Sequence, residues 1–102
     1  MTRAALESLL AKVEAGEWWD DMPRPDALHT DLCWKAFNGS LDAAKALHEA
    51  VLPGWNWKVN GVSEASVESD GPFQYAQGFT DDNPARAWLI AIIRALIEEA
   101  AE

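Results

Sequence analysis

The apolar positions of this chain change their spacing twice, from helical to alternating and back to helical. Over residues 3–15 and 41–52, apolar side chains recur at steps of three and four, which is typical of helices with one buried stripe, and over residues 26–37 they spread more widely around a helix. Ser40 is a suitable N-cap for a helix that Pro53-Gly54 would end. This part of the chain predicts helices over residues 3–15, 26–37 and 41–52.

The spacing then becomes that of β-strands. Trp55, Trp57 and Val59 alternate with polar residues, as in a strand with one buried face. Asn60-Gly61 is a turn signal typical of hairpins, and Ser69-Asp70-Gly71-Pro72 is a second turn. The pattern predicts three strands in an antiparallel meander, over residues 55–60, 63–69 and 73–79.

A helix is predicted to close the chain over residues 84–100. Asp81-Asp82-Asn83-Pro84 combines capping side chains, acids and a proline in the first turn, which are helix start signals. The pattern therefore predicts a single α+β domain over residues 1–102, in which a three-stranded antiparallel meander is covered by helices, like an α-β-α sandwich, with further helices at the N-terminus. The residues predicted for the centre of its core are Leu47, Val51, Trp55, Trp57, Val59, Trp88, Leu89 and Ile92, and Trp34 is also assigned to the core.

The charge of the chain argues against two classes of partner. There are 17 acidic and 8 basic residues, and the net charge of −9 is spread over both halves. Lys and Arg are nowhere clustered, so direct binding to nucleic acid or to an anionic membrane is not expected. The acidity either serves solubility or offers an acidic face to a protein partner with a basic surface.

The sequence offers little enzymatic chemistry. Cys33 is the only cysteine, so the chain can form neither an internal disulfide nor a cysteine-based zinc site, which fits a reducing compartment. His29 and His48 have no carboxylate or thiol at a metal-ligand spacing. Phosphate-binding loops and nucleophile elbows are also missing, and no stretch approaches the roughly 20 apolar residues of a membrane span. We predict no catalytic activity, no metal and no cofactor.

The most distinctive segment is Trp18-Trp19-Asp20-Asp21, in a predicted loop. The acid pair could in principle serve as a general acid and base. Aromatic anchors beside acids also suit docking on a basic, partly apolar protein surface, so Trp18, Trp19, Asp20 and Asp21 are the predicted protein-binding site. The alternative is that the two tryptophans close one end of the core.

Two stretches of the chain resemble a known family. Leu41-Asp42-Ala43-Ala44-Lys45-Ala46-Leu47 is followed by Pro53-Gly54-Trp55-Asn56-Trp57-Lys58-Val59, and an alanine-rich helix begins at Asn83-Pro84. Over about residues 40–97, this pattern resembles small phage and prophage proteins described as the phage α-β-α sandwich domain family. The resemblance implies an α-β-α fold and a phage origin, and it supplies no catalytic residues to carry over. The first 39 residues depart from the family pattern.

These observations lead to two expectations for function. The first is a phage-encoded, non-enzymatic protein-binding module that acts on a host protein in the bacterial cytoplasm, for example as an inhibitor of a defence system such as CRISPR. The alternative is a virion or assembly accessory protein that self-associates into a homo-oligomer. A small enzyme using Asp20, Asp21 or the histidines is the third and least favoured hypothesis.

Overall fold

The computed structural model describes residues 3–16, 30–61, 63–69, 75–80 and 82–99. Within these residues, four helices and a three-stranded antiparallel sheet make an α+β fold, which confirms the predicted fold class. In chain order, the elements are α1 (Arg3–Glu14), α2 (Thr30–Phe37), α3 (Leu41–Val51), β1 (Asn56–Asn60), β2 (Glu64–Glu68), β3 (Tyr75–Phe79) and α4 (Pro84–Glu99). The predicted start of the second helix, over residues 26–29, and that of the third strand, over residues 73–74, lie outside the described residues.

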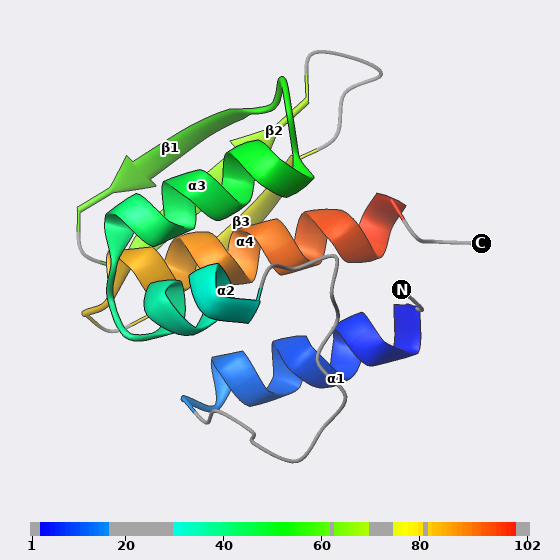
Figure 1. The fold of residues 1–102 in the computed structure, drawn as a ribbon, viewed down its shortest axis with the longest axis horizontal. Coiled ribbons are helices and arrows are strands. Elements are labelled where there is room, and N and C mark those ends of the chain that lie inside the picture. The colour runs from blue at the N-terminus through cyan, green and yellow to red at the C-terminus, as the bar shows by residue number, and fades with distance from the viewer. Residues whose placement is uncertain (1–2, 17–29, 62, 70–74, 81, 100–102) are drawn as a thin grey trace.

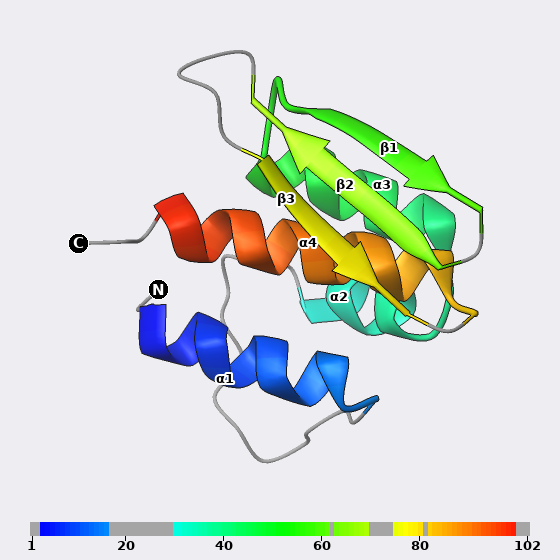
Figure 2. The same ribbon diagram turned by 180° about the vertical axis from the view of Figure 1, so that it is seen from behind.

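The sheet is a meander in which β2 lies between β1 and β3 (Figures 1 and 2). Lys58 of β1 lies opposite Ser66 of β2, and Ser66 lies opposite Gln77 of β3. The four helices lie on one side of the sheet, which Figure 1 shows in front of the strands and Figure 2 shows behind them. No described helix lies on the other side of the sheet (Figures 1 and 2).

Helix α4 lies at the centre of the fold, between the sheet and the remaining helices. It packs against β2 and β3 on one side and against α1, α2 and α3 on the other. Its residues from Ala87 to Ile93 are all buried, because partners surround the helix in every direction. A helix that is apolar on all sides is stable only in such a position. At its start, the Asn83 side chain accepts a hydrogen bond from the Arg86 N–H at 3.0 Å, so Asn83 is the N-cap within the predicted start signal 81–84.

Small residues allow α4 to approach the sheet closely. Gly78 of β3 faces the helix, and a Cβ atom built on it would lie 2.8 Å from the Ala91 nitrogen and 2.8 Å from the Ile90 Cβ. It would lie closer still to the carbonyl oxygen of Ala87. No side chain fits in this space, so the distance between helix and sheet depends on the glycine.

Two arginines of α4 bind neighbouring elements of the fold. The Arg86 Nε donates to the Phe37 carbonyl oxygen at 3.0 Å, and its guanidinium lies 4.0 Å from the centre of the Phe37 ring. Arg94 donates to the Gln77 carbonyl oxygen of β3 at 2.7 Å and forms an ion pair with Glu14 of α1. Both ends of α4 are thus tied to the surrounding elements by charged hydrogen bonds.

The predicted core is partly wrong. Leu47, Trp88, Leu89 and Ile92 are buried, as expected. Trp34 and Trp57 are both exposed, each with 45% of its surface accessible. Trp57 lies on the outer strand β1, so its indole packs on Trp88 at 4.5 Å between ring centres while its other side meets solvent. Trp34 lies on the outer side of α2 and stacks on Phe37.

The remaining three core predictions, at positions 51, 55 and 59, are half-buried and pack against the core from its margin. In the described part of the chain, none of the helices is long and apolar enough to cross a bilayer.

Candidate functional site

The predicted site at Trp18, Trp19, Asp20 and Asp21 lies outside the described residues, as does His29. The structure describes both His48 and Cys33, and the two side chains have different surroundings. His48 is buried and bonded within the core, while Cys33 is buried among apolar side chains. Among the residues that the structure describes, no three His, Cys, Asp or Glu side chains come together as a metal site would require.

The open face of the sheet is the surface on which the structure gathers exposed functional groups. Successive side chains of a strand point to opposite sides, and Ala65, Val67 and Gly78 point toward α4. The alternate residues of β2 and β3, and the β1 residues that pair with Glu64, Ser66 and Glu68, therefore point to the opposite side of the sheet. The open face consists of Asn56, Lys58, Asn60, Glu64, Ser66, Glu68, Tyr75, Gln77 and Phe79.

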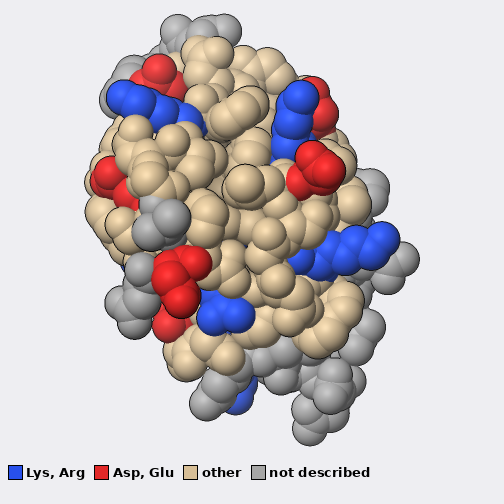
Figure 3. All heavy atoms as spheres, turned by 90° about the vertical axis from the view of Figure 1, so that its left-hand side faces the viewer, with Lys and Arg blue, Asp and Glu red and all other residues tan. Residues whose placement is uncertain are grey.

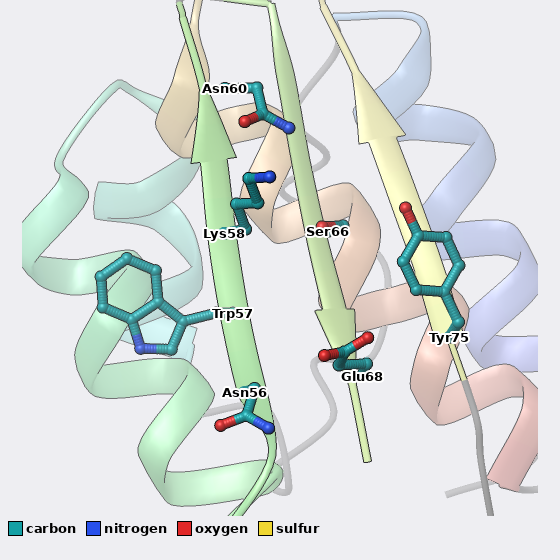
Figure 4. Close-up of a pocket in the computed structure, with 7 residues that line it drawn as sticks. All are labelled: Asn56, Trp57, Lys58, Asn60, Ser66, Glu68 and Tyr75. Atoms are coloured by element: carbon teal, nitrogen blue, oxygen red, sulfur yellow. The ribbon is translucent and has the colours of Figure 1, made fainter. Parts of the chain in front are cut away.

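A polar hollow of about 410 Å³ lies on this face (Figure 4). All three strands line it, with Asn56, Trp57, Lys58 and Asn60 from β1, Ser66 and Glu68 from β2, and Tyr75 from β3. Ser66 is only 8% exposed, and its hydroxyl has no hydrogen-bond partner in the described part of the chain. Lys58 and Glu68 likewise form no ion pair with any described residue. A buried, unpartnered hydroxyl beside two unpaired charges is available to a polar ligand group.

A second hollow of about 350 Å³ lies along the outer margin of β3, between the strand and the C-terminal half of α4. Its walls include Phe79, Arg94 and Ile97. Tyr75 lines both hollows and so forms the ridge between them. With Tyr75 45% exposed and Phe79 55% exposed, β3 presents two large aromatic groups to solvent. We call Tyr75 and Phe79, together with the second hollow, the aromatic rim.

The charges around these surfaces are mixed. Glu64 is held in place by hydrogen bonds from Gln77 at 3.1 Å and Asn60 at 3.3 Å, which leaves Glu68 as the unengaged carboxylate of the open face. Acidic and basic side chains are interspersed on the face of the molecule in Figure 3. Much of the net negative charge belongs to segments outside the described residues, since residues 17–29 alone carry four acids and one base.

Sequence reasoning assigned Tyr75 and Gln77 to a strand but missed the aromatic rim as a site. The available signal was the alternation itself, because Tyr75, Gln77 and Phe79 share one side of the strand while Ala76 and Gly78 share the other. Small residues on one side and aromatic residues on the other indicate that the small side meets a helix and the aromatic side does not.

Cys33 has the chemistry of a buried structural thiol. Burial raises its pKa to about 12 from an ordinary value of 9.0, so the thiolate that acts as a nucleophile does not form near neutral pH. Between these two pH values, the folded state keeps a proton that the unfolded state loses. We therefore expect the free energy of unfolding to fall as pH rises above 9, and to fall less in a Cys33→Ala variant.

Denaturant titrations of both proteins at pH 8 and at pH 10 measure this difference. An identical pH dependence in wild type and variant would show that the buried thiol does not contribute.

Comparison of the chain with protein-family models, with curated proteins and with solved structures finds no match in any of the three. The resemblance to the phage α-β-α sandwich family therefore stays a prediction.

Proposed function

We propose that this protein is a non-enzymatic binding module that holds another protein against the aromatic rim and the adjoining open face of its sheet. The observation that carries this proposal is the exposure of Tyr75 and Phe79 on a strand whose other side is fully packed. Large aromatic groups on one exposed strand are costly to leave in water, and they are enriched where proteins bind one another.

The shape of the surface supports a protein rather than a small molecule as the ligand. The surface has two hollows rather than one enclosed cavity, Tyr75 lines both of them, and the lining of the first is largely polar. A small ligand is usually enclosed in one concave, mostly apolar cavity. A protein surface can instead place one side chain in each hollow while its backbone passes over the Tyr75 ring.

The side chains also indicate the chemistry of the partner. Apolar groups of the partner would pack on Phe79 and Tyr75, and a hydrogen-bond donor or a basic side chain would reach the unengaged Glu68 carboxylate. The partner surface is accordingly apolar at its centre and basic on the side that meets β2. This matches one of the two interpretations of the net charge, in which acidic residues face a protein partner with a basic surface.

A double variant, Tyr75→Ser with Phe79→Ser, tests the proposal. We expect it to lose at least about tenfold in affinity for the partner, because it removes both aromatic anchors. Both side chains are exposed, so the free energy of unfolding should change by only about 1 kcal/mol. Affinity capture from a bacterial lysate, followed by calorimetry with the captured protein, measures both effects.

Trp34→Ser is the matched control, because Trp34 is equally exposed but lies on α2. The control should retain the partner. Retention by the double variant, or equal loss in the control, would contradict binding at the aromatic rim.

The narrower hypothesis concerns the origin of the protein and the identity of its partner. We propose a phage protein that acts on a host protein in the bacterial cytoplasm, with inhibition of a defence system such as CRISPR as one form of that action. It is supported by the resemblance over residues 40–97 and by the net charge of −9. A plasmid-interference assay tests the inhibitory form, which predicts that plasmid survival rises when the protein is expressed.

A further inference from the structure

The two outer edges of the sheet differ in how well they are protected. The Thr80 N–H donates to the Ser63 carbonyl oxygen at 2.8 Å. This bond establishes which residues of β2 and β3 direct their backbone N–H and C=O groups toward each other. Backbone groups alternate in direction along an antiparallel strand. Accordingly, Gln77 directs its backbone groups to the outer edge of β3, and Trp57 and Val59 direct theirs to the outer edge of β1.

The edge of β3 is occupied, whereas no described residue pairs with that of β1. Arg94 donates to the outward carbonyl oxygen of Gln77 at 2.7 Å, so a side chain of α4 blocks pairing there. No described helix or strand lies beyond β1 in Figures 1 and 2. The N–H and C=O groups of Trp57 and Val59 thus form an open template for another strand.

Lys58 lies between these two residues and determines the charge of the edge. It is the only charged residue of β1, and no described carboxylate pairs with it. Its side chain lies on the open face (Figure 4). A strand added to β1 would place one of its own side chains directly opposite Lys58, where an opposite charge is favourable and a like charge is not.

A second copy of the chain is a poor occupant of this edge. Antiparallel pairing that uses both Trp57 and Val59 sets Lys58 against Lys58 of the second copy. A shift one way sets Val59 opposite Trp55, whose N–H already donates to Leu52 and whose carbonyl oxygen accepts from His48.

A shift the other way sets Trp57 opposite Gly61, which has a φ of +63° and is not extended. Each of these antiparallel registers of two copies therefore either sets Lys58 opposite Lys58 or loses half of the hydrogen bonds between the two β1 edges.

We infer that β1 binds an extended segment of a different protein that carries Asp or Glu opposite Lys58. The neighbouring positions of that segment point to the helix side, where they would pack on the exposed part of the Trp57 indole and on Val59. In the sequence of the bound segment, an acidic residue therefore stands between two apolar residues. The aromatic rim lies at the opposite edge of the sheet, so substitutions of Tyr75 and Phe79 leave the β1 edge unchanged.

Selection of random peptides by display on the wild-type protein and on a Lys58→Glu variant tests this inference. Wild type should enrich peptides with a central Asp or Glu between apolar residues, and the variant should enrich Lys or Arg at the same position. Bound peptide should slow amide hydrogen exchange at Trp57 and Val59 at least about tenfold. The Tyr75→Ser, Phe79→Ser variant should bind the same peptides as wild type, which separates this result from the fate of the proposed function.

Three results would overturn the inference. One is the absence of any enriched peptide, and another is enrichment that does not change with the charge of residue 58. The third is a dimer, detected by sedimentation, in which the Trp57 and Val59 amides are already protected. Because Lys58 is exposed, the variant should fold, and its circular dichroism and unfolding midpoint confirm that.

Discussion

A Gly78→Ala substitution is expected to destabilise this protein by about 3 kcal/mol or more, at or beyond the upper end of ordinary overpacking effects. The added methyl group would meet the backbone of α4 at Ala87 and Ala91, which cannot turn aside as a flexible side chain can. The helix or the strand must move, and α4 contacts every other helix and strand of the fold. Denaturant unfolding followed by circular dichroism measures the loss.

Gly61→Ala is the matched control. Gly61 has a positive φ of +63° but open space around it, so alanine should cost only about 1 kcal/mol through backbone strain. Equal losses at the two glycines would show that the approach of α4 to β3 is looser than the structure indicates.

The second large effect is expected at His48, which is 2% exposed. The Trp88 Nε1–H donates to the His48 Nδ1 at 3.3 Å, so the other ring nitrogen carries the proton and donates to the Trp55 carbonyl oxygen at 2.9 Å. One side chain thus joins α3, α4 and the start of β1. His48→Ala should cost about 3 kcal/mol or more, because it leaves a cavity and two polar groups without partners.

His48→Gln is the matched control, because it keeps most of the volume of the side chain and both of its hydrogen-bonding groups. A glutamine amide can accept from Trp88 and donate to Trp55, so this variant should lose only about half as much as His48→Ala. Thermal unfolding of both variants provides the comparison. If alanine costs no more than glutamine, neither the hydrogen bonds nor the volume of the His48 side chain supports the fold.

The elements of this fold follow from local patterns in the sequence. Alternation assigned Trp57 and Val59 to the same face of a strand, and in the structure both point toward the helices. The start of α4 could also be predicted from the sequence, because Asn83 and Pro84 influence residues that lie next to them in the chain. Such features depend on positions within a few residues of one another, which is why periodicity and capping reveal them.

Exposure depends instead on which elements become neighbours in space. Trp57 is exposed because β1 is an outer strand, and strand order is not encoded in the alternation of β1 itself. The role of His48 was likewise hidden, since its partner Trp88 lies 40 residues away. The aromatic rim required knowing that α4 covers the side of β3 that carries Gly78.

Site-specific photo-cross-linking tests the central claim of protein binding at the aromatic rim most directly. A benzophenone amino acid would replace Phe79 in one variant and Trp34 in another, and both would be irradiated in living bacterial cells. Our account predicts that position 79 forms a covalent adduct with one defined partner protein and that position 34 forms none. Equal adducts from both positions, or none from position 79, would contradict it.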